Sequence, residues 1–324
     1  MDRTIEERSG YIFENLKCVY CESALEVSAH LFNESHIRCS HCSQHYPVVE
    51  NVPILINEVK SIFSFKSFTS KSNLFFDISW RGKLISRITK FIPSLGRNWV
   101  AKENFQLLSQ LLTGCTPKAK VLILGGSIAG YGMNKFLKNP ELEIIESDVS
   151  FGSRTQIIFD AHNIPYKDFT FDLVIAQAVL EHVIDPYRCV EEIHRVLKPD
   201  GIVYAETPFM QQVHGGPYDF TRFSRSGQRR LFKKYIEVKS GMIAGSGTAL
   251  LWSYEYLLLS LFGYTDILRL LIKAFARYTG FLLPYLDFLC KKNPRAIDSA
   301  SALFFLGRKN EREISDRELI EYYK

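Results

Sequence analysis

The chain has 324 residues, of which 46% are hydrophobic and 23% charged, and its formal net charge is +5 at pH 7. This is an ordinary globular composition with enough apolar residues for a sizeable core, and the length suits two domains or one large domain with an appendage. The first ten residues, MDRTIEERSG, lack the apolar run of a secretory signal, so we expect a cytoplasmic protein.

Four cysteines near the amino terminus have the spacing of a metal-binding module. Cys18 and Cys21 form one Cys-x-x-Cys pair, Cys39 and Cys42 form another, and seventeen residues separate the pairs. Four thiolates suit tetrahedral zinc, and metal binding supplies folding free energy that so short a module cannot gain from a core. We predict a zinc ribbon over residues 1–57. The remaining cysteines, Cys115, Cys189 and Cys290, are expected to be buried thiols.

The segment after the ribbon is basic and aromatic. Between Glu58 and Lys102 the chain has nine basic and two acidic residues, interleaved with Phe63, Phe65, Phe68, Phe75, Phe76 and Trp80. Residues 58–100 are therefore either a surface for phosphate backbones or anionic lipid, or a connector whose aromatic side chains pack on the main domain while its lysines are solvated.

A glycine-rich turn, residues 125–130, follows an apolar strand predicted over 121–124. Glycines at such a turn let backbone amides approach a ligand at a helix amino terminus. A second predicted strand precedes Glu146 and Asp148, and Asp148 lies close to the spacing of about 20 residues expected for a carboxylate that binds ribose hydroxyls. Glu146 is the competing candidate for this role.

The segment 171–208 predicts a strand, a helix and a second, parallel strand. Asp185 and Pro186 form a helix start, because the Asp side chain accepts free backbone amides and proline has none to lose. The helix is expected to end over 198–201, and a strand is expected over 202–205. Ligands of open α/β sheets bind beyond the carboxyl ends of the strands, where Gln177 and Glu206 lie.

QAVLEHV at 177–183 and RVLKPDG at 195–201, with the strand that follows, resemble the class I S-adenosylmethionine-dependent methyltransferases. The resemblance spans roughly residues 100 to 240 plus a closing strand at 302–306. It implies an α/β fold over residues 101–324, with a Rossmann-like, seven-stranded, mostly parallel sheet whose last strand is antiparallel. It also implies S-adenosylmethionine as the cofactor and methyl transfer to an oxygen or nitrogen of an unidentified acceptor.

The resemblance also implies positions for the cofactor. Asp148 would bind the ribose, Asp160, Ala161 and His162 would lie beside the adenine, and Gln177 would lie near the methionine part. The expected cofactor-binding residues are Gly125, Gly126, Ser127, Gly130, Asp148, Asp160, Ala161, His162 and Gln177.

Two rival functions follow from the same segments. Ser127 and Ile123 replace the middle glycine and the acid of the usual pattern, which favours a non-catalytic binding protein. A nicotinamide dehydrogenase would share the glycine turn and the ribose acid, but LEHV and RVLKPDG belong to the methyltransferase pattern.

A polar loop, TPFMQQVHGGPYDFTRFS, follows the strand at 202–205. His214 is the candidate base, because imidazole titrates near neutral pH, and Tyr218 and Asp219 are candidates to orient it or the acceptor. The alternative is a loop whose side chains bond their own backbone. The loop resembles that of methyltransferases of bacterial surface glycans, which implies a glycan or small-molecule acceptor. His182 is expected to be structural.

The predicted zinc ribbon resembles a second group of proteins. The cysteine quartet and the two short strands expected around Glu50 and Asn51 resemble small zinc-ribbon proteins that activate tRNA and protein methyltransferases as separate subunits. A second likeness is to ribosomal RNA guanine methyltransferases with an amino-terminal zinc module. Both imply that the ribbon docks a substrate or braces the catalytic domain. With the basic segment, they make an RNA-modifying enzyme the alternative function.

A helical insertion is expected over 248–292, between strands at 236–243 and 302–306. Charged residues interrupt its apolar runs before any reaches the about 20 residues of a membrane span. One helical face carries Ile267, Leu270, Leu271, Ala274 and Tyr278, and the other carries Arg269, Lys273 and Arg277. The pattern fits an interfacial helix at a membrane surface, a lid over the active site, or an interface in a homo-oligomer.

Overall fold

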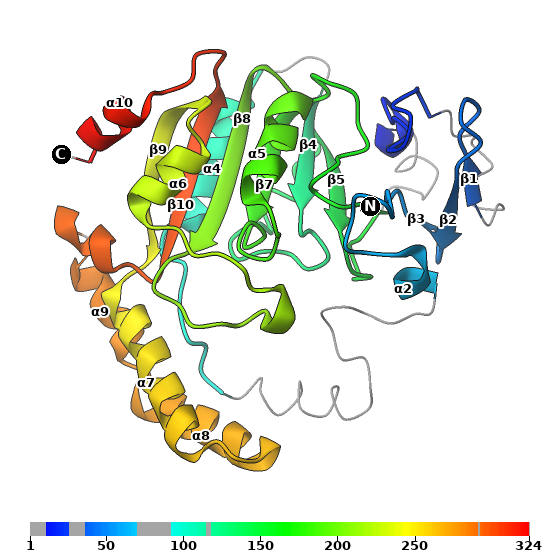
Figure 1. Ribbon diagram of the computed structural model, residues 1–324. Coiled ribbons are helices and arrows are strands. Elements are labelled where there is room, and N and C mark those ends of the chain that lie inside the picture. The colour runs from blue at the N-terminus through cyan, green and yellow to red at the C-terminus, as the bar shows by residue number, and fades with distance from the viewer. Residues whose placement is uncertain (1–10, 26–35, 70–91, 115–117, 291, 324) are drawn as a thin grey trace.

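The computed structural model describes residues 11–25, 36–69, 92–114, 118–290 and 292–323 (Figure 1). Its main element is a seven-stranded sheet in the order β6-β5-β4-β7-β8-β10-β9, beside a three-stranded sheet of order β1-β2-β3. Within the seven-stranded sheet, only β10 runs antiparallel to its neighbours, β8 and β9. The predicted class I methyltransferase architecture is therefore confirmed.

The strands have the following bounds. They are β1 (His36–Arg38), β2 (His45–Val49), β3 (Val52–Pro53), β4 (Ala119–Leu124), β5 (Leu142–Asp148), β6 (Ile157–Ile158), β7 (Phe171–Gln177), β8 (Leu197–Pro208), β9 (Tyr235–Ala244) and β10 (Ala302–Lys309). The α-helices are α2 (Phe65–Thr69), α4 (Ala101–Leu111), α5 (Pro186–Val196), α6 (Arg225–Leu231), α7 (Ser246–Phe262), α8 (Asp266–Thr279), α9 (Leu283–Cys290) and α10 (Asp316–Glu321). Short 3₁₀ turns cover Gly216–Tyr218 and Pro294–Ser299.

The sheet is buried on both faces, as the continuous apolar runs of its strands predict. Successive residues of β7 alternate between two cores: Leu173 and Ile175 join one, and Val174 and Ala176 join the other. Helices α5 and α6 lie on one face and α4 on the other (Figure 1). A strand covered on both faces has no polar side to show to water, which is why its sequence is apolar throughout.

Helix α5 begins as predicted but ends earlier. Asp185 accepts the backbone N–H of Arg188 at 3.0 Å, and Pro186 is the first helical residue. The helix stops at Val196, because Leu197 already pairs with Phe171 in the sheet. The expected helix end at 198–201 is therefore wrong, and those residues form an irregularity inside β8, where Asp200 has a φ of 59°.

The expected helix after the glycine turn is not formed. Residues 125–127 and 131–138 are turns, with Leu137 N donating to Met133 O at 2.9 Å. Gly132 has a φ of +82°, and a residue in the left-handed region interrupts a right-handed helix. The ligand-facing part of this segment is therefore the turn itself and not a helix terminus.

The amino-terminal module continues the edge of the main sheet. Leu55 N donates to Ile158 O at 2.8 Å, which joins the chain after β3 to the edge strand β6. Between β2 and β3, Glu50 and Asn51 both have positive φ and make the predicted tight turn. On the same side, the buried Tyr166 donates its hydroxyl to Ile12 O at 2.9 Å. The module and the main sheet thus share one core.

The described part of the basic segment packs as a connector. Phe63 and Phe68 are 9% and 1% exposed, whereas Lys60 and Lys66 lie at the surface. The aromatic side chains therefore serve the core and the lysines are solvated, as one of the two interpretations predicts. Phe75, Phe76, Trp80 and most of the basic residues of this segment lie outside the described residues.

The late insertion consists of α7, α8 and α9, which project from the β9–β10 side of the sheet (Figure 1). Asp287 accepts Gly245 N at 2.9 Å, Gly247 N at 2.7 Å and the Thr248 hydroxyl at 2.6 Å, so that α9 caps the start of α7. Arg277 pairs with the buried Glu255 at 2.6 Å and joins α8 to α7. In the described ranges, no helix is both long and apolar enough to cross a bilayer.

The apolar face predicted for α8 is exposed. Ile267, Leu271 and Tyr278 are 75%, 60% and 55% exposed, while the buried residues of α8 are Ile272 and Ala276. Packing within this chain therefore uses a different face from the one that the sequence pattern indicates. The expected membrane or subunit contact of that face stays a prediction.

We predict that Tyr166→Phe lowers the free energy of unfolding by about 1–3 kcal/mol, because a buried carbonyl loses its hydrogen-bond donor. Urea unfolding followed by circular dichroism measures this change. Tyr264→Phe is the matched control, since Tyr264 is 84% exposed. Equal stability of the two variants would show that the Tyr166 hydroxyl does not hold the amino-terminal segment.

Candidate active site

A cavity of 220 Å³ lies at the carboxyl ends of β4 and β5 and beside the loop after β7. Strand β4 pairs with β5 on one side and with β7 on the other. The connection from β4 to β5 and the connection from β6 to β7 therefore run to opposite sides of β4. In open α/β sheets this switch point is where ligands bind. The walls are formed by Ile62, Phe63, Leu124, Gly125, Ser127, Ser147, Asp148, Val149, Phe159, Asp160, Ala161, His162, Ala178, Val179, His182, Val183 and Ile184.

Asp148, at the end of β5, is the acid that faces the cavity. Its carboxylate accepts Ser127 N at 3.1 Å, which ties the glycine turn to β5, and burial raises the pKa of this carboxyl. The competing candidate, Glu146, pairs in a bidentate manner with Arg154 at 2.7 Å. Of the two acids, only Asp148 lines the cavity.

Asp160, Ala161 and His162 also line the cavity. Burial alone would raise the pKa of the Asp160 carboxyl, but hydrogen bonds from His162 and Ser61 lower it. The Nδ1 of His162 lies 2.5 Å from Asp160, and its Nε2 accepts Asp185 N at 3.0 Å. The imidazole therefore connects Asp160 to the start of α5 through its two ring nitrogens.

The glycine turn is shaped by close neighbours. Gly125 has a φ of +69°, and a Cβ there would lie 2.5 Å from the Val179 side chain. A Cβ on Gly130 would lie 1.7 Å from the amide oxygen of Gln177. Gly126, Gly130 and Gln177 are not among the cavity walls. Ile123 is buried in the core.

Glu206, at the end of β8, is a buried acceptor for several donors. It accepts from Asn98 at 3.0 Å, Gln177 at 2.9 Å and the Tyr204 hydroxyl at 2.5 Å. Burial raises the pKa of this carboxyl. The sequence placed Glu206 at this edge but gave no sign of the network, because Asn98 and Tyr204 come from distant segments.

The loop after β8 is organised by Asp219. Its buried carboxylate pairs with Arg222 and accepts His214 N at 2.7 Å and Gly215 N at 3.0 Å. Burial opposes ionisation, but Arg222 and the two amides lower the pKa of Asp219 below its usual range. The ring of Tyr218 stacks on Phe63 with 6.2 Å between centroids, and Phe63 lines the cavity.

Helix α7 supports the same loop from outside. The Trp252 ring lies 6.0 Å from the His214 ring, Ser253 accepts from Gln212 at 3.2 Å, and the Tyr256 hydroxyl donates to Val213 O. The late insertion thus forms a wall beside the candidate base.

Glu181 and His182, in the loop after β7, join His214 in one cluster. The Glu181 Oε1 lies 3.8 Å from His182 Nε2 and 3.9 Å from His214 Nε2. Burial raises the pKa of Glu181 to about 8. The sequence missed Glu181, although its place beside His182 after a strand end was the available signal. His182, expected to be structural, lines the cavity.

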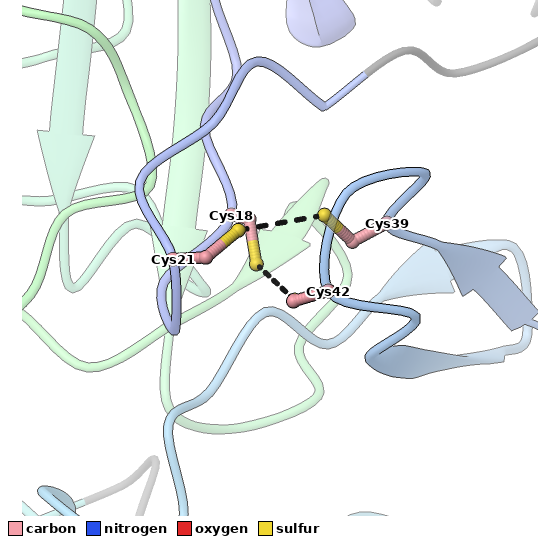
Figure 2. Close-up of side chains that lie close together, drawn as sticks. All are labelled: Cys18, Cys21, Cys39 and Cys42. Atoms are coloured by element: carbon pink, nitrogen blue, oxygen red, sulfur yellow. Dashed lines mark hydrogen bonds between the residues drawn. The ribbon is translucent and has the colours of Figure 1, made fainter.

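The structure brings the four cysteines of the amino-terminal module together (Figure 2). Cys18 and Cys42 Sγ atoms lie 3.6 Å apart, Cys21 and Cys39 Sγ atoms lie 3.7 Å apart, and all four lie within 4.8 Å of one another. Four sulfur atoms at about 2.3 Å from one zinc ion lie about 3.8 Å apart. The donors and their spacing therefore fit a tetrahedral zinc ion.

A comparison with protein families finds a methyltransferase domain in one part of the chain. Residues 135–205, which include β5 to most of β8, match the family model described as a methyltransferase domain. The human mitochondrial protein named arginine-hydroxylase NDUFAF5 is 37% identical over 67 residues, which span 19% of each chain. The chain therefore matches only about a fifth of the length of the curated relatives.

Two solved structures are similar to this chain over most of its length, but only at a low level. Phosphoethanolamine N-methyltransferase 2 of Haemonchus contortus, with S-adenosyl-L-methionine, has a TM-score of 0.43 and 15% identity over 80% of this chain and 62% of that one. The [4+2]-cyclase SpnF has a TM-score of 0.42 and 14% identity over 70% of this chain and 92% of that one. At these values the comparisons identify no reaction.

We predict that Glu206→Gln destabilises the fold by about 1–3 kcal/mol, because the new amide places a donor among groups that already donate to this position. Urea unfolding measures the change, with the exposed Glu311→Gln as the matched control. A Glu206→Gln protein as stable as the control would show that the network contributes no stability.

Proposed function

We propose that the chain is an S-adenosylmethionine-dependent methyltransferase that acts on a hydroxyl or amine acceptor. The observation that carries the proposal is the cavity at the β4 switch point, which Asp148 and residues 160–162 line. The methyltransferase-domain match over 135–205, which includes this region, supports it. The acceptor class, a glycan or small molecule, rests on the loop after β8 alone.

The residues fit this cofactor in a specific manner. Asp148 would accept the ribose hydroxyls, because its carboxylate faces the cavity while Ser127 N holds it in place. The apolar walls formed by Phe63 and Val149 would enclose the adenine, next to Ala161. Gln177 does not line the cavity, so its proposed contact with the methionine part depends on the cofactor reaching past Val179 toward the strand end.

The bound cofactor would supply a methyl group on a sulfonium. The protein's task is to align the acceptor with that methyl, so that the new bond forms as the carbon–sulfur bond breaks. His214 would take the acceptor's proton through Nε2 when no metal ion is bound to this nitrogen. Asp219 would orient the loop by fixing two backbone amides. Tyr218 would position the acceptor beside Phe63.

We predict that Asp148→Asn raises the Kd for S-adenosylmethionine about 10- to 100-fold, because two charge-assisted hydrogen bonds are weakened. Isothermal calorimetry measures the change, with the exposed Glu141→Gln as control. Absence of heat, and of protection from thermal unfolding, for the wild-type protein at millimolar cofactor would overturn the methyltransferase proposal in favour of a binding protein that does not use this cofactor.

We further propose that the cysteine quartet holds one structural zinc ion that braces the cavity. The spacing of the sulfur atoms supports this role. The buried Tyr46 hydroxyl lies 3.0 Å from Cys18 Sγ and could donate to its thiolate. The chain then runs from β3 to Ser61, which donates to Asp160, and to Phe63 in the cavity wall.

We predict that the full-length protein carries one equivalent of zinc and that Cys39→Ser removes it. Because the module supports Ser61 and Phe63, the same variant should weaken S-adenosylhomocysteine binding. Mass spectrometry of bound metal and calorimetry measure the two effects, with Cys290→Ser as the control thiol variant. Zinc-free protein with full stability and affinity would contradict the proposal.

Each of the other expected partners is supported by one segment of the chain. An RNA acceptor rests on the basic segment, whose cations lie largely outside the described residues. Contact with a membrane surface or a second copy is supported by the exposed apolar residues of α8. The cytoplasmic location stays a prediction, and the human relative is named as a mitochondrial protein.

A further inference from the structure

One buried carboxylate of the site lacks a partner for one of its oxygens. Glu181 is 1% exposed, and within the described ranges its Oε2 has no hydrogen-bond partner. Burying a carboxyl oxygen without a compensating interaction is costly. A side chain held in this manner next to His182, which lines the cavity, points to a ligand that the protein is built to bind.

Two imidazoles face the same carboxylate. His182 Nε2 and His214 Nε2 lie 3.8 and 3.9 Å from Glu181 Oε1, and the ligand atoms of the three residues lie within 4.8 Å of one another. Two donors bound to one ion at about 2.0–2.2 Å lie up to about 4.3 Å apart. The separations from Glu181 are thus too long for hydrogen bonds and suitable for atoms that share an ion.

The far nitrogens of both imidazoles face acceptors. His182 Nδ1 lies 2.7 Å from Tyr218 O, and His214 Nδ1 lies 3.3 Å from Gln212 O and 3.6 Å from Asp219. A proton on His182 Nδ1, and on His214 Nδ1 when it donates to Gln212 O instead of accepting from Arg222 Nη2 at 3.5 Å, leaves the Nε2 lone pairs directed at Glu181. Metal-binding histidines are commonly oriented in this way by a carbonyl or carboxylate.

The loops around the cluster fix its side chains in place. The Arg222 guanidinium lies 3.5 Å from His214 Nδ1, and its charge is balanced by the ion pair with Asp219. Gly215 lies so close to His182 that a Cβ there would be 2.5 Å from the ring, so the loop is fitted to the imidazole. The cluster comes from two loops at neighbouring strand ends, after β7 and after β8, and these loops meet only in the folded chain.

We propose that Glu181, His182 and His214 form a binding site for one divalent first-row transition cation at the acceptor side of the cavity. One carboxylate and two imidazoles are a donor set suited to such ions, and three protein ligands leave coordination positions open. His182 also lines the cavity, so an ion bound here would face its interior.

The role of this ion rests on the proposed methyl transfer. An acceptor hydroxyl, as on a sugar, would bind at an open position, and the cation would lower the pKa of that hydroxyl so that its proton passes to solvent water. The oxygen would then bond to the methyl carbon as the carbon–sulfur bond breaks. His214 would then be a metal ligand through Nε2 and could not accept a proton there. The metal-bound and metal-free roles of His214 are exclusive, and they differ in whether turnover needs a cation.

The test uses full-length protein whose cysteine quartet is first filled with one equivalent of zinc. This protein is titrated with Co²⁺, which does not displace zinc from thiolates and which absorbs visible light when bound. Calorimetry and absorption together give the stoichiometry and the affinity. We expect one equivalent of Co²⁺, without the sulfur-to-metal charge-transfer absorption that a thiolate site would produce.

Variants then assign the site. Glu181→Gln and His214→Gln should each lower Co²⁺ affinity at least about 10-fold, whereas the exposed Glu191→Gln should bind as the wild type does. His214 lies in a loop and is 28% exposed at its side chain, so its variant tests the site without replacing a core residue. S-adenosylhomocysteine binding and thermal unfolding of each variant report whether the fold is intact.

The outcomes separate the two proposals. Wild-type protein that binds S-adenosylhomocysteine but no Co²⁺, or a folded His214→Gln variant with wild-type Co²⁺ affinity, overturns the metal site. Co²⁺ binding that depends on Glu181 and His214, in a protein that binds no S-adenosylhomocysteine, supports the metal site and overturns the methyltransferase proposal instead.

Discussion

The parallel pairing of β4 with β5 on one side and β7 on the other decides where the site lies. The connection after β4 leads to β5 on one side, and the connection after β6 returns to β7 on the other side. The carboxyl ends of these strands are therefore not covered by one crossover, and a cavity forms there. Asp148 is the last residue of β5, Glu181 lies in the loop after β7, and Glu206 lies near the end of β8, so each acid reaches the same edge from a different strand. Burial of both sheet faces makes that edge the place where these polar groups can gather.

The amino-terminal module is part of this construction. Its backbone joins β6 at Leu55, and the following residues reach Asp160 through Ser61. Phe63 then lines the cavity and stacks on Tyr218, so it contacts both the cavity and the loop after β8. A change at the cysteine quartet is therefore connected to the cavity through a short stretch of chain, which gives the bracing role a physical basis.

The two sides of the cavity differ in how their polar groups are satisfied. On the proposed cofactor side Asp160, His162 and the start of α5 are joined by hydrogen bonds. On the proposed acceptor side Asp219 and Arg222 fix the loop, but Glu181 keeps an oxygen without a partner in the described part of the chain. A satisfied wall serves to hold shape, whereas an unsatisfied buried group marks a place where a ligand can contribute most.

The sequence by itself determined the features that depend on local chemistry and spacing: the cysteine quartet, the start of α5 at Asp185, and the turn at Glu50 and Asn51. The methyltransferase likeness added the seven-stranded sheet with an antiparallel last strand. The sequence misplaced the end of α5 and expected a helix after Gly130, because strand pairing at Leu197 and the left-handed Gly132 overrode the pattern. Only the tertiary structure decided that Glu146 pairs with Arg154 while Asp148 faces the cavity, and that Glu181 meets His182 and His214. The physical reason is that each of these partnerships joins residues from different strand ends, loops or connections, and their distance is set by the packing of the sheet and not by their separation along the chain.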